Sequence, residues 1–155
     1  MKITYAELSS TGPVRPHNED FVKFWEPESE QARSTRGAVA LLADGVGGQG
    51  DGEVASALAV DTALKVFQDA DPSASDNQLL WRMFNAANVA VYDTGMAHGA
   101  PDRMGSTLTV ALFRRNEVAI GHVGDSRAYL VRQGQARLLT SDHTYVAMQV
   151  DRKST

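Results

Sequence analysis

The sequence predicts an α+β domain in which helices cover one face of an antiparallel sheet and another sheet covers the other face. Apolar residues alternate with polar ones near both ends of the chain, and two stretches between them carry apolar residues at helical spacing. The chain has 155 residues, of which 43% are hydrophobic and 22% are charged. This balance is typical of one soluble globular domain.

Strands are expected first along the chain. Residues 3–10 and 20–25 are predicted to be short strands, and the polar residues 26–37 are predicted to form a hairpin tip. Residues 38–43 are apolar at every position, which is typical of a central strand buried on both faces. This strand leads directly into Asp44 and Gly45.

Two helices are predicted next, the first over residues 53–68. The second follows a capping box at residues 75–78. Gly95 and Gly99 are expected to end it. Its apolar stripe indicates core packing rather than a cofactor site and consists of Leu80, Met83, Phe84, Ala87 and Val91.

From Gly105 the apolar residues recur with a period of two, which is typical of half-buried strands. Strands are predicted around residues 108–112, 118–120 and 128–130. Residues 115–116 and 133–134 have the composition of tight turns. The pattern predicts an antiparallel meander.

Composition and charge exclude several classes of protein. The chain has no cysteine, so disulfides and thiolate metal ligands are excluded. A net charge of -4 disfavours a nucleic-acid partner. No apolar run is long enough for a signal peptide or a membrane span, so a cytoplasmic location without membrane contact is expected.

Acidic residues gather in or beside glycine-rich turns, where carboxylates can converge on a hard cation. Five such segments stand out: GPVRPHNED at 12–20, ADGVGG at 43–48, GEVAS at 52–56, MGST at 104–107 and HVGDSRAYL at 122–130. Together, with LTSDH at 139–143, they resemble the ordered signature of the PP2C (PPM) family of metal-dependent protein serine/threonine phosphatases, of the bacterial type.

The resemblance implies an α-β-β-α sandwich of two antiparallel sheets flanked by helices. Residues 1–155 would form one such domain with its C-terminal part missing. In the family, two further segments each supply an aspartate ligand, and this chain ends before them. The loss of two carboxylates is expected to weaken metal binding and to leave apolar surface and strand edges unpaired.

Dephosphorylation suits the residue types in these segments, because a phosphate monoester is dianionic and very slow to hydrolyse unaided. A centre of two Mn²⁺ or Mg²⁺ ions neutralises the charge and activates a water molecule. By resemblance, Asp44 would bridge the two ions and Gly45 would offer its carbonyl oxygen. Asp125 matches a third, weaker metal position of bacterial relatives.

The resemblance assigns further roles around the metals. Glu19 and Asp20 would hold metal-bound waters, and the Thr107 hydroxyl would help to orient one of them. Arg15 would clamp the phosphate, since a guanidinium can grip two phosphate oxygens. Many relatives have a histidine near the Asp-Gly turn as a candidate general acid, whereas this chain has Val46 and Gln49 there. His17 or a metal-bound water would then have to protonate the leaving group.

Other polar residues of the motifs have structural interpretations. Arg127 is expected to anchor its loop through a carboxylate or a backbone carbonyl. Asp142 and His143 are expected to cap a helix that begins near them. His98 and His122 are interpreted as structural or surface residues.

The hypothesis is therefore a phosphatase acting on phosphoserine and phosphothreonine proteins, a cognate Ser/Thr kinase among them. The alternative is a truncated phosphatase-like module that binds phosphoproteins without turnover. A P-loop is excluded because the loop at residues 44–52 has no Gly-Lys-Ser/Thr. An EF-hand is excluded because Val46 and Gly48 stand where oxygen ligands are needed.

Overall fold

A computed structural model describes residues 2–13, 16–47, 51–99 and 104–144. Its elements, in chain order, are β1 (Asp20–Trp25), α1 (Glu30–Arg36), β2 (Ala38–Val46), α2 (Asp51–Asp69), α3 (Asp76–Ala97), β3 (Gly105–Ser106), β4 (Leu108–Arg114), β5 (Glu117–Val123), β6 (Tyr129–Arg132) and β7 (Gln135–Leu138). Five strands form one antiparallel sheet with the order β1-β2-β4-β5, and β3 pairs with the end of β2. Strands β6 and β7 form a separate two-stranded sheet.

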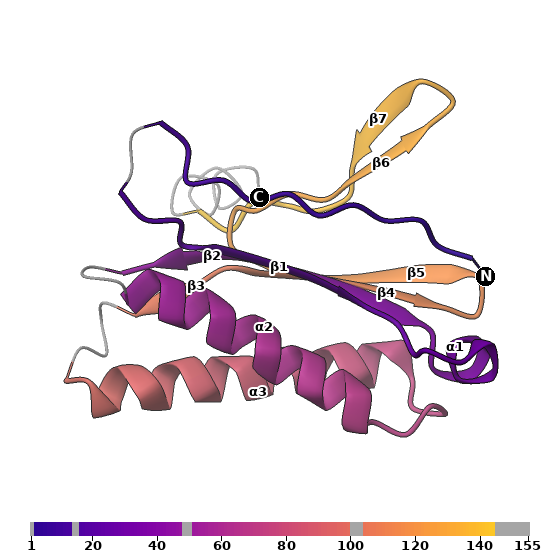
Figure 1. The fold of residues 1–155 in the computed structure, drawn as a ribbon, viewed down its shortest axis with the longest axis horizontal. Helices are drawn as coiled ribbons and strands as arrows, with labels where there is room; N and C mark the ends of the chain where they lie inside the picture. The colour runs from indigo at the N-terminus through magenta and orange to yellow at the C-terminus, as the bar shows by residue number, and fades with distance from the viewer. Residues whose placement is uncertain (1, 14–15, 48–50, 100–103, 145–155) are drawn as a thin grey trace, which may run out of the picture.

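Helices α2 and α3 cover one face of the five-stranded sheet (Figure 1). Side chains alternate between the faces of a strand, so Val39, Leu41 and Ala43 of β2 share the face that meets the helices. All three are buried, together with Val110 and Leu112 of β4. The predicted α+β class is therefore confirmed, and the core lies between the helix pair and this sheet.

The capping box predicted for α3 is confirmed, since Ser75 is the N-cap and its hydroxyl accepts a hydrogen bond from the Gln78 N–H at 3.3 Å. The predicted stop at Gly95 is wrong, because α3 continues to Ala97. Gly95 is buried within the helix, and tertiary packing there outweighs the low helix propensity of glycine. The helix terminates before Gly99, which has a φ of 68°.

The polar segment at residues 26–37 is not a simple hairpin tip, because it contains the short helix α1. Ser29 caps this helix by accepting a hydrogen bond from the Ala32 N–H at 3.2 Å. Gly37 follows with a φ of 82°, and a Cβ there would lie 2.2 Å from the Phe113 carbonyl oxygen. Glycine is thus required where α1 passes into β2.

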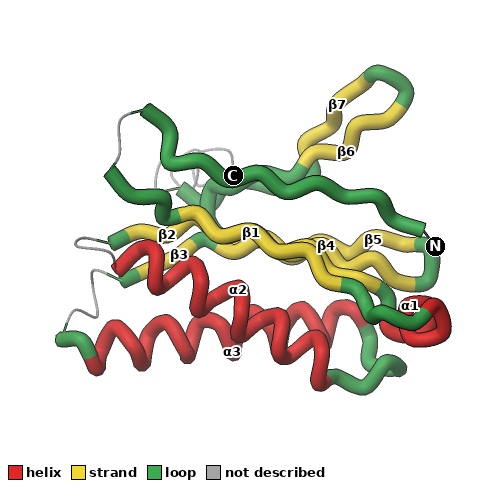
Figure 2. The backbone as a smooth tube through the Cα atoms, in the orientation of Figure 1, coloured by secondary structure: helices red, strands yellow, loops and turns green. Residues whose placement is uncertain are grey.

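The strand predicted at residues 3–10 is wrong. This segment has no regular secondary structure and runs along the sheet as a loop (Figure 2). The Phe24 N–H of edge strand β1 donates to the carboxylate of Glu7 rather than to a backbone carbonyl. The Tyr5 ring stacks on the Phe24 ring with centroids 4.0 Å apart. Side-chain contacts therefore hold the segment, and no strand ladder forms.

The predicted meander is only partly correct. Strands β4 and β5 form a hairpin through Arg115 and Asn116, whose φ angles of 52° and 61° fit a tight primed turn. The next strand does not join them, because Gly124, with a φ of 108°, redirects the chain. Strand β6 instead pairs with β7 and extends away from the five-stranded sheet (Figure 1).

The second face of the five-stranded sheet is more open than predicted for a strand buried on both sides. Leu42 of β2 points to this face and is 42% exposed. Phe24, Leu42 and Phe113 occupy the same face, as the strand register shows. We call this side of the sheet the open face. It carries the acidic residues described below.

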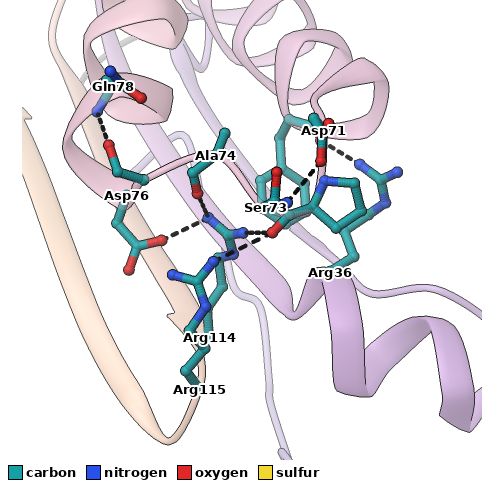
Figure 3. Close-up of polar contacts among 11 residues, drawn as sticks. Arg36, Asp71, Ser73, Ala74, Asp76, Gln78, Arg114 and Arg115 are labelled. Carbon is teal, nitrogen blue, oxygen red and sulfur yellow. Dashed lines mark hydrogen bonds and ion pairs between the residues drawn. The ribbon is translucent and has the colours of Figure 1, made fainter.

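Buried Arg114 ties the sheet to the α2–α3 connection (Figure 3). Its guanidinium forms an ion pair with Asp76 at 2.6 Å and donates to the carbonyl oxygens of Pro72 and Ala74. Its Nε has no acceptor among the described residues. Arg36 donates to the carbonyl oxygens of Phe67 and Ala70, and so caps the end of α2. The connection is therefore held by Arg114 from β4 and by Arg36 from the end of α1.

We expect Arg114→Ala to lower the free energy of unfolding by about 3 kcal/mol. The change removes a buried cation and leaves Asp76 and the two carbonyl oxygens without this hydrogen-bond donor. Arg115→Ala is the matched control, since Arg115 is exposed and donates only one long bond of 3.3 Å to Pro72. That change should cost less than about 0.5 kcal/mol. Urea denaturation measures both, and equal losses would refute the role given to Arg114.

Candidate functional site

Asp20 and Asp44 lie side by side where β1 begins and β2 nears its end. They are directly paired residues of neighbouring strands. Asp44 shares the open face with Leu42, two residues earlier on the strand, and Asp20 shares it with Asp44 through the register. Two adjacent carboxylates repel each other unless a cation lies near them, so this pairing suits a divalent metal ion.

The two aspartates line a polar cavity of about 210 Å³. Its other walls come from the loop before β1 and from the N-terminal segment, and consist of Ser10, Thr11, His17, Asn18 and Glu19. The Asn18 side chain accepts a hydrogen bond from the Asp20 N–H at 3.1 Å and donates to Ser9 at 2.6 Å. These bonds fix the loop that carries His17 and Glu19.

Gly45 brings β2 into direct contact with the start of α2. A Cβ at Gly45 would lie 1.9 Å from the Gly52 carbonyl oxygen, so no other residue fits. The Gly45 N–H donates to the Glu19 carbonyl oxygen at 3.0 Å. The Glu19 carboxylate lies against Gly52, because a Cβ at Gly52 would be 2.7 Å from Glu19 Oε1. A carboxylate at the N-terminus of a helix is stabilised by the helix dipole.

Thr107 holds the backbone of Asp44 from the β4 side. Its hydroxyl accepts a hydrogen bond from the Asp44 N–H at 2.8 Å, and its own N–H donates to the Asp44 carbonyl oxygen at 2.9 Å. Ser106 Oγ donates to the same carbonyl oxygen at 3.2 Å. The Ser126 hydroxyl lies 2.8 Å from the Thr107 hydroxyl. The roles of Ser106 and Ser126 were not predicted from the sequence, although both residues lie within the motifs at 104–107 and 122–130.

Asp125 is exposed in the loop after β5. Gly124 packs closely against the Thr107 side chain, as a Cβ at position 124 would be only 2.5 Å from Thr107 Cγ2. The Gly124 carbonyl oxygen lies 3.0 Å from His122 Nε2 and accepts the His143 N–H at 2.7 Å. His122 is therefore structural, as predicted, and the loop is linked to Asp44 through Ser126 and Thr107.

Arg127 anchors this loop through a carboxylate, as predicted. Its guanidinium makes a two-pronged hydrogen bond to Asp142, with Nε 2.9 Å from Oδ1. This bond lowers the pKa of Asp142 below its ordinary value and raises the pKa of Arg127, and the charges of His122 and His143 add to the effect on Asp142. The carboxylate of Asp142 thus accepts hydrogen bonds from Arg127. The helix expected after Asp142 lies outside the described residues.

Two predicted positions cannot be placed, because Arg15 and Gln49 also lie outside the described residues. Val46 is described and is 64% exposed beside the site. Within the described part of the chain, no three histidine, aspartate or glutamate side chains meet closely enough to hold an ion by themselves. The donor set still fits a hard divalent cation, because two carboxylates are adjacent and the glycine at position 45 is confined at the same strand end.

Comparison with known proteins identifies the class to which this fold and site belong. The model of the family described as Protein phosphatase 2C matches residues 9–147. The chain therefore belongs to the protein phosphatase 2C family.

Comparison with individual relatives supports the same family assignment. The chain is 37% identical to the serine/threonine protein phosphatase PstP of Mycobacterium tuberculosis, over 96% of this chain and 27% of that protein. It is 30% identical to the serine/threonine phosphatase stp of Listeria welshimeri, over 87% of this chain and 52% of the relative. The chain thus spans between about a quarter and a half of the length of these two relatives.

Solved structures show the same fold. The M. tuberculosis PstP/Ppp crystal structure matches with a TM-score of 0.77 and 34% identity, covering 96% of this chain and 58% of that one. The PstP catalytic domain in complex with two manganese ions matches with a TM-score of 0.76, covering 59% of that chain. Among the described residues, no helix combines the length and the apolar character needed to cross a bilayer.

We expect Thr107→Val to lower the free energy of unfolding by about 1–3 kcal/mol, because the part-buried Asp44 N–H loses its acceptor. Thr107→Ser keeps the hydroxyl and should recover most of that loss. Chemical denaturation of both variants measures the difference. If valine costs little and serine costs more, packing of the Thr107 methyl group, which valine keeps, and not its hydrogen bond, fixes Asp44.

The Arg127–Asp142 pair predicts a pH dependence. Because the folded pKa of Asp142 lies below its unfolded value, the pair stabilises the fold at neutral pH and loses its effect as the pH falls through the folded pKa. The difference in unfolding free energy between the native chain and Arg127→Gln should therefore be constant above about pH 5 and shrink towards pH 3. Denaturation at several pH values tests this, with Arg137→Gln as the control.

Proposed function

We propose that this chain carries the metal-binding half of a protein serine/threonine phosphatase that hydrolyses phosphoserine and phosphothreonine. The observation that carries the proposal is the paired Asp20 and Asp44 at one end of the open face, in a polar cavity that also contains Glu19. Membership of the protein phosphatase 2C family and the naming of both relatives as serine/threonine phosphatases support it.

Asp44 and Gly45 would hold the metal ions, and Asp125 would contribute a further, weaker position. The two manganese ions in the PstP catalytic domain support a binuclear centre, for which Mg²⁺ is the other candidate metal. Bound ions of this kind neutralise phosphate charge and lower the pKa of a bound water. The doubly hydrogen-bonded backbone of Asp44 supports its role, since a ligand held rigidly loses little entropy on binding.

The remaining residues would handle substrate and protons. Glu19 and Asp20 would accept hydrogen bonds from ordered waters in the cavity. His17 lines the same cavity and is exposed, so it can donate a proton to a departing serine or threonine oxygen. Arg15 would grip the phosphate oxygens with parallel hydrogen bonds. Substrates would be phosphoproteins, with a cognate Ser/Thr kinase as one candidate.

A second candidate function is binding of phosphoproteins without turnover. It is favoured by the lack of three converging metal-ligating side chains among the described residues. The two functions differ in one observable, because a binding module retains a phosphopeptide whereas a phosphatase releases inorganic phosphate from it.

The test combines manganese titration by calorimetry with phosphate release from a phosphopeptide. Asp44→Asn should weaken Mn²⁺ binding at least about tenfold and abolish any metal-dependent release, because a carboxylate shared by two ions is lost. Asp69→Asn is the control, since Asp69 is an exposed acid at the other end of α2, paired with Lys65. Unchanged Mn²⁺ binding in Asp44→Asn would refute the assignment of the site.

A further inference from the structure

Helix α3 exposes large apolar side chains on the face that points away from the core. Trp81, Val89, Tyr92 and Met96 are 69%, 47%, 57% and 51% exposed. At 100° per residue these positions, with Asn85 between them, fall on one stripe. The buried residues Met83, Ala87 and Val91 lie on the other side of the helix. We call the exposed set the α3 stripe.

The α3 stripe has the shape of a helix-pairing surface. Its first and last members, Trp81 and Met96, are fifteen positions apart, or roughly 22 Å at 1.5 Å per residue. Apolar residues recur along it at intervals of three, four and eight residues, which is the spacing of a seam between two helices. Scattered exposed apolar residues are ordinary, but four large apolar side chains aligned on one helix face, interrupted only by Asn85, indicate an interaction surface.

Charges beside the stripe indicate the partner. After its first residue, α3 carries only two charged side chains, Arg82 and Asp93. They are eleven residues apart, which is close to three turns, so they lie on the same edge of the stripe, one near each end. If two copies of α3 pair antiparallel through this edge, the basic end of each copy faces the acidic end of the other.

We propose that the α3 stripe pairs with the α3 stripe of a second copy of this chain, antiparallel and about a two-fold axis near Asn88 and Val89. In this arrangement equal edges face each other, so Arg82 lies opposite the partner's Asp93 and the reverse. Trp81 then lies opposite the partner's Met96. A parallel two-fold pairing would instead place the charged edges of the two helices on opposite sides of the seam, so Arg82 and Asp93 would lose these complementary partners, which disfavours it.

The proposed interface leaves the phosphatase site accessible. Asp20 and Asp44 lie on the open face of the sheet, whereas α3 lies under the opposite face (Figure 1). Two copies joined through α3 would therefore carry their cavities on their outer sides. Pairing would not depend on bound metal, and it could be tested independently of catalysis.

The first test is sedimentation equilibrium of the 155-residue chain over a range of concentrations. A monomer–dimer equilibrium is expected, and Trp81→Glu should weaken it at least about tenfold, because it places a charge in the seam. Arg82→Glu and Asp93→Arg should each weaken it by about tenfold, and the double variant should return to within about threefold of the native chain. Circular dichroism checks that each variant is folded.

A control separates this surface from the exposed sheet β6–β7. Val131 of β6 is 71% exposed, and Val131→Glu should leave the dimer unchanged if α3 forms it. A chain that stays monomeric at all concentrations would overturn the proposal. So would a dimer that resists Trp81→Glu and dissociates with Val131→Glu, or a double charge swap that fails to restore pairing.

A second test fixes the antiparallel register by crosslinking. The chain has no cysteine, so a single introduced thiol can react only with its copy in the partner. Val89→Cys lies beside the proposed axis and should crosslink readily with a short bismaleimide. Gln78→Cys, on the same helix face, would lie roughly 30 Å from its copy and should not. Equal crosslinking of both variants would overturn the antiparallel pairing.

Discussion

The close contact between the end of β2 and the start of α2 is the constraint on which the site depends. Because Gly45 and Gly52 have no side chains, strand and helix approach until a Cβ on the first would almost coincide with the carbonyl oxygen of the second. Glu19 completes the contact, with its backbone on Gly45 and its carboxylate at Gly52. The loop before β1, the strand that carries Asp44 and helix α2 are therefore positioned by one junction. A side chain at Gly45 would push β2 and α2 apart, and one at Gly52 would displace the Glu19 carboxylate.

Elements specified by local chemistry could be predicted from the sequence, and elements specified by distant contacts could not. Ser75 predicts the start of α3, because its capping hydrogen bond involves only a residue three positions further along the chain. The segment at residues 3–10 alternates like a strand, yet its position is set by Glu7 and Tyr5 contacting Phe24, far along the chain. The low helix propensity of Gly95 predicts a helix end, but its burial within α3, which the sequence does not display, outweighs that propensity.

The same division holds at the candidate site. The resemblance to the family predicted that Asp20 and Asp44 belong to one site, and the register of β1 and β2 pairs them directly. Motif spacing could not predict that the Thr107 hydroxyl would be engaged by the Asp44 N–H, since that bond joins residues 63 positions apart. Its further contact with Ser126 links the loop of Asp125 to the same backbone. The site is thus supported by hydroxyl groups whose importance becomes visible only in three dimensions.

The five-stranded sheet separates two surfaces with different physical requirements. Its open face carries the paired carboxylates of Asp20 and Asp44, and the Asp44 end of β2 is held by hydrogen bonds to Thr107 and to the Glu19 backbone. Its other face is closed by α2 and α3, so the outer side of α3 lies on the opposite side of the sheet from the open face (Figure 2). Substitutions on the two surfaces share no partners among the described contacts, and effects of such separated changes on stability generally add. The rigid apolar layer between them therefore allows a site that needs charge and a surface that buries apolar groups to coexist in one small domain.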